Sequence, residues 1–264
     1  MKFKIVSCLI LLLFLLNVAC DKHVNVFSKP DDFTLSHGGI IRLDTTKKNI
    51  YLAFTGHEFS DGKYIIQQVL KKNGAKASFF FTGDFYRNSK NKEVIMQLKK
   101  DDNYLGAHSD KHLLYCDWDN RDSSLVSKDS FMIDLVNNYS ELEKIGVGKN
   151  EAFYYMPPYE WYNTKNADWC KEFGVQILNF TPGTYSNADY TVPSMGNRYL
   201  SSDTIYNRII RYEQNNTNGL NGFILLLHIG TDEERTDKMY DRLDDLILDL
   251  KNKGYSFLSL KDIL

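Results

Sequence analysis

The sequence predicts an α/β fold in a single domain, and three observations predict it. Short apolar, β-prone runs alternate with segments of helical periodicity from residue 49 to residue 264. No shift in composition interrupts this alternation, which favours one parallel sheet over two separate domains. About 245 residues remain once an N-terminal leader is set aside, which is an ordinary size for one α/β barrel.

The expected strands are short apolar runs, several of which are closed by Gly, Pro or Thr. They cover residues 50–54, 77–81, 104–108, 153–156, 175–180, 223–228 and 255–258. The expected helices carry apolar residues at spacings of three and four, as Ile66, Val69 and Leu70 do in the first of them. They cover residues 62–72, 93–100, 130–145, 167–173, 202–212 and 238–253.

The first residues differ in composition from the rest and predict export. Lys2 and Lys4 precede an apolar run of about a dozen residues, the pattern of a secretory signal peptide over 1–19. Small residues before Cys20 resemble the lipobox of bacterial lipoproteins, in which that Cys carries the lipid. The alternatives are a simple cleaved signal or a tethered anchor. Residues 20–48 are polar and are expected to form a lipid-anchored tether and lead-in, with the chain at a membrane, periplasmic or on the cell surface.

Charge and cysteine usage exclude other classes of protein. The formal net charge is −2 and no long run of Lys or Arg occurs, which argues against nucleic acid as a partner. The 17 Tyr and 16 Phe suit either a carbohydrate-binding groove or an ordinary core. The chain has no C-x-x-C pair, so a thiolate zinc site is not expected, whereas Cys116 and Cys170 could pair in an oxidising compartment.

Several of the residues that the sequence singles out stand at the ends of expected strands. In parallel α/β sheets the functional residues gather at the carboxyl ends of the strands. Thr55, His108, Met156 and His228 all fall at such ends, which predicts that they share one site. His108 and His112 are four residues apart, and on a helical turn both imidazoles would reach one metal ion.

Four segments resemble the landmarks of the polysaccharide deacetylase (NodB-homology) family, and they occur in the family's order. They are Lys76-Ala77-Ser78-Phe79-Phe80-Phe81-Thr82-Gly83, His108-Ser109-Asp110-Lys111-His112, Met156-Pro157-Pro158-Tyr159-Glu160 and Leu226-Leu227-His228. The resemblance covers roughly residues 49–264. It implies a distorted (β/α) barrel and a metal-dependent hydrolase that removes acetyl groups from a glycan.

The chain also departs from the family's pattern. The family's T-F-D-D-G motif supplies a base Asp and a metal-binding Asp, and these positions fall on Thr55 and Gly56. The Arg that braces the base is replaced by Met156. Within the family frame, Glu58 could complete a zinc-type site with His108 and His112, with His57 and Asp61 as alternatives. Glu160 stands where the family has Gly and is expected to act as general base if burial raises its pKa.

The resemblance assigns roles to three more positions. His228 matches the catalytic acid that protonates the leaving amine, and the backbone N–H of Tyr159 matches a group that holds the oxyanion. The segment around Asp189 lies where the family has an acidic residue that tunes the acid His. The groove-lining candidates are Trp161, Tyr162, Asp168 and Trp169.

Two classes of function follow from the sequence. The first is a metal-dependent hydrolase, with zinc as the expected ion, that removes N-acetyl or O-acetyl groups from a polysaccharide or oligosaccharide. The alternative is a catalytically silent carbohydrate-binding protein on the same fold. His108, His112 and His228 favour the enzyme, whereas Thr55, Gly56 and Met156 favour the binding protein.

Overall fold

The computed structural model describes residues 32–264. The expected signal peptide and Cys20 lie outside the described residues. Within the described part, none of the helices is long and apolar enough to span a membrane.

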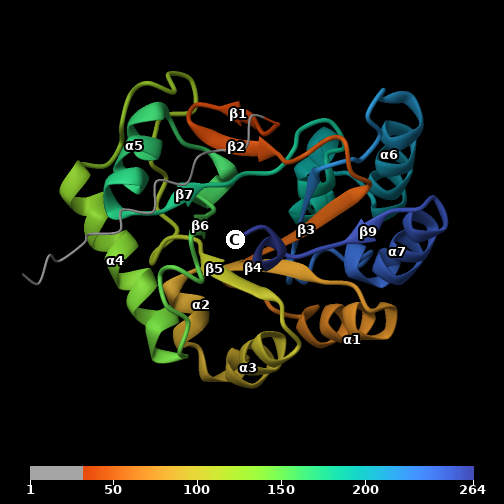
Figure 1. The fold of residues 1–264 in the computed structure, drawn as a ribbon, viewed down its shortest axis with the longest axis horizontal. Coiled ribbons are helices and arrows are strands. Elements are labelled where there is room, and N and C mark those ends of the chain that lie inside the picture. The colour runs from red at the N-terminus through yellow and green to blue at the C-terminus, as the bar shows by residue number, and fades with distance from the viewer. Residues whose placement is uncertain (1–31) are drawn as a thin grey trace, which may run out of the picture. The chain divides into compact units, whose positions relative to one another are not determined.

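The fold is a curled, wholly parallel sheet surrounded by helices, as the sequence predicts (Figure 1). The 7-stranded sheet has the order β7-β6-β5-β4-β3-β8, and β9 pairs with β3. Its strands are β3 (Asn49–Gly56), β4 (Ala77–Phe81), β5 (Tyr104–Ala107), β6 (Tyr154–Tyr155), β7 (Gln176–Ile177), β8 (Phe223–His228) and β9 (Ser256–Phe257). The helices are α1 (Lys63–Asn73), α2 (Gly83–Arg87), α3 (Lys92–Lys100), α4 (Lys128–Lys144), α5 (Thr164–Phe173), α6 (Ser202–Asn215) and α7 (Leu243–Asn252).

The predicted elements are confirmed, with differences at their ends. The bounds of β4 and β8 agree with the expected ranges, whereas β6 and β7 are shorter than expected. The helix expected over 238–253 is a 3₁₀ turn, Met239–Arg242, followed by α7. Helix α2, which has five residues, is not among the predicted elements. Thr82 caps its first turn by accepting a hydrogen bond from the Phe85 N–H.

The segment expected as a tether contributes to the fold. Strands β1 (Thr34–Ser36) and β2 (Gly39–Arg42) form an antiparallel hairpin. Ile40 forms a parallel bridge with Leu178, and the Thr181 N–H donates to Ile224 of β8. The hairpin and the chain after β7 therefore lie between the two edges of the curled sheet. The segment 20–48, which was expected to be a lead-in, is thus part of the domain from Thr34 onward.

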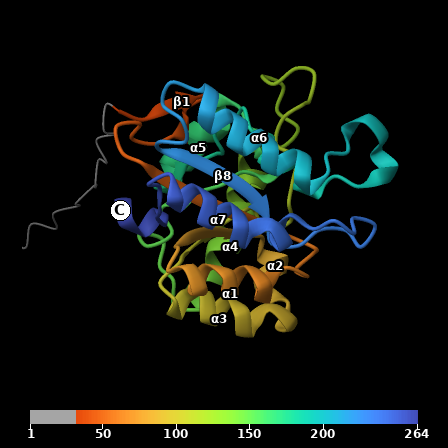
Figure 2. The same cartoon turned by 90° about the vertical axis from the view of Figure 1, so that its right-hand side faces the viewer.

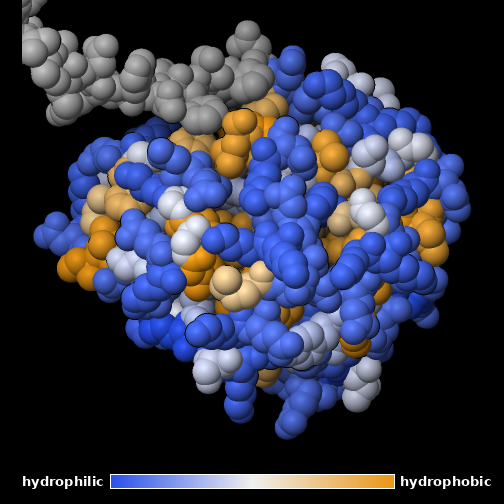
Figure 3. Space-filling model, turned by 60° about the horizontal axis from the view of Figure 1, so that its bottom comes forward, coloured by the Kyte–Doolittle hydropathy of each residue, from blue (hydrophilic) through white to orange (hydrophobic). Residues whose placement is uncertain are grey.

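Alternation along the strands divides the core into two layers. Because successive side chains of a strand point to opposite faces, Phe54, Phe79 and Phe81 pack against the helices, whereas Tyr51, Phe80 and Tyr104 fill the inside of the curl. Helices α6, α7, α1 and α3 follow one another along one side of the sheet (Figure 2). The outer surface in Figure 3 is mainly hydrophilic, with apolar side chains in small separate groups. Because the strands are parallel, their carboxyl ends lie along one edge of the sheet.

Candidate active site

A cleft of about 810 Å³ opens at the carboxyl edge of the sheet. Its walls come from the loops after β3, β5, β6 and β8 and from the 3₁₀ segments between β7 and α6. The lining residues include Thr55, Gly56, His57, Glu58, Phe59, His108, His112, Trp118, Tyr159, Glu160, Tyr190, Met195, Arg198, His228 and Asp232. The prediction that His108, His112 and His228 share one cleft is confirmed; Met156, also expected at this edge, is fully buried below it.

His108 is buried and held in one orientation. Its Nδ1–H donates to the Met156 carbonyl at 2.9 Å, which leaves Nε2 as the free ring nitrogen. The rings of His108 and His112 lie 5.1 Å apart with planes inclined at 59°. Burial lowers the pKa of His108 to about 3 and, together with the other imidazoles, that of His112 to about 2. Both rings are therefore neutral, the form that binds metal ions.

The two histidines do not lie on a helical turn, contrary to the sequence expectation. Residues 108–112 form an irregular loop, in which Ser109 and His112 adopt left-handed backbone with φ of 71° and 56°. Left-handed backbone is costly for residues other than Gly and is concentrated at functional sites. The positions of His108 and His112 are therefore set by long-range contacts and not by helical spacing along the sequence.

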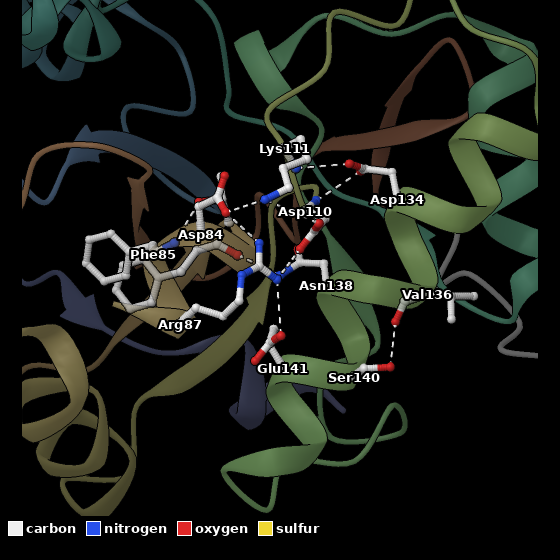
Figure 4. Close-up of polar contacts among 12 residues, drawn as sticks. Asp84, Phe85, Arg87, Asp110, Lys111, Asp134, Val136, Asn138, Ser140 and Glu141 are labelled. Atoms are coloured by element: carbon white, nitrogen blue, oxygen red, sulfur yellow. Dashed lines mark hydrogen bonds and ion pairs between the residues drawn. The ribbon is translucent and has the colours of Figure 1, made fainter. Parts of the chain in front are cut away.

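Polar side chains of α2 and α4 hold this loop in place (Figure 4). Asn138 accepts a hydrogen bond from the His108 N–H at 2.7 Å. Asp134 accepts the N–H groups of Asp110 and Lys111, both at 3.0 Å, and Arg87 binds the Asp110 carboxylate at 2.6 Å. Sequence reasoning missed these residues. The signal was present, because Asp134 and Asn138 are polar residues four apart on the buried face of α4.

The third metal ligand expected from the sequence is not brought to the histidine pair. Glu58 lines the cleft, but its side chain is exposed. The ring of His57 is stacked on His112 at 4.8 Å with planes only 9° apart, so one ion cannot lie in the plane of both rings. Asp61 accepts hydrogen bonds from Tyr240 and the Thr231 N–H and pairs with Lys238, so it has a structural role.

The position of the family's metal-binding Asp has no room for a side chain. A Cβ on Gly56 would lie 2.8 Å from Ile229, 2.9 Å from Phe81 and 3.0 Å from Phe85. Among residues 32–264, no three His, Cys, Asp or Glu side chains gather into a potential metal site. A zinc site normally has at least three protein ligands. The donors among the described residues therefore do not complete the metal site that the family implies.

His228 and Asp189 form a close pair on the opposite wall. The His228 Nδ1–H donates to one Asp189 oxygen at 2.6 Å, and the His228 backbone N–H donates to the other at 2.9 Å. Burial lowers the pKa of His228, but the Asp189 carboxylate outweighs it, and the net pKa is raised. Asp189, matched only loosely from the sequence, is thus in direct contact with the ring that it was expected to tune.

Glu160 lies close to this pair. Burial raises the pKa of its carboxyl to about 7; the charge of His228 opposes the rise and that of Asp189 adds to it. Tyr159 and Glu160 both have left-handed backbone, with φ of 58° and 52°. A Glu in a conformation that suits Gly is maintained at a cost of roughly 1–2 kcal/mol. Glu160 therefore has a strained backbone and a carboxyl whose pKa suits proton transfer near neutral pH.

Four other expected groove residues and the cysteines lie elsewhere. Tyr162 is buried, and Trp169 packs against Phe131. None of Trp161, Tyr162, Asp168 and Trp169 lines the cleft. Cys116 and Cys170 are both buried and free, so the disulfide considered from the sequence is not formed.

The fold and the cleft define a class of protein: a parallel β/α half-barrel with a histidine-lined cleft at the carboxyl edge of its sheet. The sequence profile described as "Polysaccharide deacetylase" matches residues 42–178, just over half of the chain. The chain therefore belongs to the polysaccharide deacetylase family, a family of carbohydrate-acting hydrolases that are metal-dependent in general.

Two relatives of known name are deacetylases. The chain is 26% identical to the peptidoglycan-N-acetylmuramic acid deacetylase PdaA of Bacillus subtilis, over 84% of this chain and 73% of that protein. It is 22% identical to the peptidoglycan-N-acetylglucosamine deacetylase of Bacillus cereus, over 86% of this chain and 93% of that protein.

Solved structures share the fold. PdaA of Bacillus subtilis, a family 4 carbohydrate esterase, superposes with a TM-score of 0.66 at 24% identity, covering 86% of this chain and 84% of that one. A family 4 pseudoenzyme of Bacillus anthracis superposes equally well, with a TM-score of 0.66 at 19% identity, covering 86% of this chain and 69% of that one. The fold is thus shared by enzymes and by a protein described as a pseudoenzyme.

Proposed function

We propose that this protein is a cell-envelope deacetylase that removes acetyl groups from an amino-sugar glycan. The observation that carries this proposal is the placement of the Asp189–His228 pair beside Glu160, in the same cleft as His108 and His112. The raised pKa of the His228 imidazole and the Glu160 pKa of about 7 suit a proton donor and a proton acceptor near neutral pH.

The chemistry assigned to these residues is hydrolysis by general acid and base. Glu160 takes a proton from a water molecule while the oxygen of that water adds to the acetyl carbonyl carbon. His228 donates its proton to the amine nitrogen as the C–N bond breaks, and Asp189 stabilises the charged ring before that transfer. The products are acetate and a free amino sugar. An O-acetyl ester would follow the same steps with an alcohol as leaving group.

Peptidoglycan is the glycan that the relatives favour. PdaA acts on its N-acetylmuramic acid and the Bacillus cereus relative on its N-acetylglucosamine. The N-terminal sequence supports the same compartment, since export and a lipid on Cys20 would hold the domain next to the cell wall. We therefore propose a lipoprotein facing peptidoglycan, with the glycan and the membrane as its partners.

No reaction step is assigned to a metal ion. Zinc, the ion expected from the sequence, suits the neutral imidazoles of His108 and His112, but two protein ligands fall short of a zinc site. In the proposed site the two rings line the acetyl-binding end of the cleft, where Nδ1 of His108 is bonded to the Met156 carbonyl and its Nε2 is left for a ligand.

A second candidate function is glycan binding without turnover. It is favoured by Gly56, where the packing of Ile229, Phe81 and Phe85 leaves no room for a metal-binding carboxylate. It is also favoured by Thr55, whose buried hydroxyl has no hydrogen-bond partner and cannot replace a base.

Two measurements on the same purified protein separate these functions. Acetate release from peptidoglycan fragments and from chitin oligosaccharides reports hydrolysis, and calorimetric titration with the same ligands reports binding. Release by the wild type that is lost in Glu160→Gln supports the deacetylase. Binding without release would refute it and support the second candidate, and absence of both would refute the two together.

A further inference from the structure

We infer that a row of aromatic rings leading out of the cleft is a binding platform for a second sugar unit, next to the one that carries the reacting acetyl group. The inference depends on the proposed glycan ligand but not on turnover. It assigns a role to Trp118, which the sequence did not single out.

The rings form a continuous series. The ring of Tyr159 lies 4.4 Å from that of His112, and the ring of Trp118 lies 5.7 Å from Tyr159, edge-on at 81°. Trp118 in turn stacks on Trp161 at 5.6 Å with planes 29° apart. The series therefore begins at the histidine pair and runs outward through residues of the loops after β5 and β6.

Trp118 is held at the surface by its neighbours. The Trp161 Nε1–H donates to the Asp117 carbonyl at 3.1 Å, and the Arg121 guanidinium lies 3.9 Å from the Trp161 ring centre. Arg121 also donates to the Tyr162 carbonyl at 2.6 Å. The Asp117 carboxylate accepts the N–H groups of Asp119 and Asn120, which closes the turn. The platform is preorganised, so little conformational entropy is lost on binding.

The exposed rings of the platform suit the apolar face of a pyranose. Trp118 is 55% exposed and Tyr159 45%, although both line the cleft. A large apolar ring held open at the mouth of a cleft marks a binding surface. The apolar C–H face of a sugar ring covers such a surface while its hydroxyls stay in water. Because Tyr159 contacts His112 and Trp118 lies one ring further out, Trp118 takes the neighbouring sugar of an oligosaccharide and not the reacting one.

Binding to ligands of different length tests this inference. Wild-type protein and Trp118→Ala are titrated with N-acetylglucosamine and with chitotetraose, and intrinsic fluorescence and calorimetry report binding. We expect wild type to bind chitotetraose more tightly than the monosaccharide. Trp118→Ala should lose about tenfold in affinity for chitotetraose only, with Trp118→Phe recovering most of it. Tyr64→Ala is the control, because Tyr64 is an exposed aromatic on α1 that does not line the cleft, and it should change neither affinity.

The inference is overturned if Trp118→Ala weakens both ligands equally or neither, or if wild type binds the two ligands with equal affinity or binds neither. The test is independent of acetate release. A protein that binds chitotetraose through Trp118 but releases no acetate would refute the deacetylase and leave the platform standing.

Discussion

The Nδ1–H of His228 donates to the Asp189 carboxylate at 2.6 Å, and this contact joins the end of β8 to the 3₁₀ turn between β7 and α6. It orients the ring so that Nε2 is the nitrogen available to a ligand. It also raises the pKa of the His228 ring and so favours the protonated form, which burial alone would disfavour.

Removing the charge of Asp189 should lower the pKa of His228. Asp189→Asn keeps the size of the side chain but loses the carboxylate, so burial then dominates and the ring deprotonates at lower pH. NMR titration of the His228 ring measures this shift without any substrate. Asp232→Asn, in the same cleft but on another loop, is the control. An unchanged His228 pKa in Asp189→Asn would contradict the role assigned to the pair.

Replacing Glu160 with Gly should separate function from stability. Gly adopts φ near 52° without strain, so unfolding free energy should stay the same or rise by up to about 1 kcal/mol. Acetate release should fall by roughly 100-fold or more, because the proposed base is gone. Denaturant unfolding and acetate assays check the two outcomes. Full activity in Glu160→Gly would exclude Glu160 as base.

The raised pKa values predict the pH dependence. A base with a pKa of about 7 is active only once deprotonated, so activity should rise with pH through about 7. It should fall again as His228 loses its proton above its ordinary value of 6.5. The rate of acetate release plotted against pH should therefore be a narrow bell. The residual acetate release of Glu160→Gln should lack the rising limb.

The unfolding free energy should fall as the pH rises through the range in which Glu160 ionises. The pKa of Glu160 in the folded state is raised above its ordinary 4.5. The contribution of Glu160 to the unfolding free energy is therefore fully present below pH 4.5 and is lost as the pH rises to about 7. The unfolding free energy of wild type relative to Glu160→Gln should therefore decrease over that interval. An increase would mean that the Glu160 pKa is not raised.

Introducing the family's metal-binding Asp at position 56 should not create a metal site. An Asp at this position would collide with Ile229, Phe81 and Phe85, so Gly56→Asp should be destabilised by roughly 1–3 kcal/mol. It should bind no more zinc than wild type does. Elemental analysis and denaturant unfolding measure both. One zinc ion per chain in purified wild type would show that the described donors do complete a site.

The network of Figure 4 should contribute to stability. Arg87 neutralises Asp110 and Glu141, whose side chains are only 5% and 11% exposed. Arg87→Ala would leave Glu141 with its exposed partner Lys144 and Asp110 with only a 4.0 Å contact to Lys111. The change should cost about 2 kcal/mol, discounted because Arg87 itself is a third exposed. Lys128→Ala removes an ion pair of exposed side chains with Glu172 and should cost well under about 1 kcal/mol. Equal losses in the two variants would contradict this account.

The sequence predicted the sheet well for a physical reason. Strands such as β4 and β8 are buried on both faces, so they appear as apolar runs bounded by turn residues. The hairpin β1–β2 gave no such signal, because distant contacts stabilise it. Its Arg42 donates to the carbonyls of Gly219 and Asn221, which no local pattern reveals.

The site was predictable where it depends on the strands. His108 directly follows β5 and His228 is the last residue of β8, so their convergence could be expected from a parallel sheet. Loop residues were not predictable, because tertiary bonds decide where they point. Asp61 is drawn to Lys238 and Tyr240, and Glu58 remains exposed, so the expected third ligand is absent from the histidine pair.

Acetate release from a defined acetylated glycan tests the central claim most directly. Wild type, His228→Gln and Glu160→Gln are incubated with chitotetraose and with peptidoglycan fragments at pH 7, and acetate is measured over time. Release by wild type, reduced at least about 100-fold in each variant, is the expected result. No release by wild type, or equal release by all three proteins, would contradict the claim.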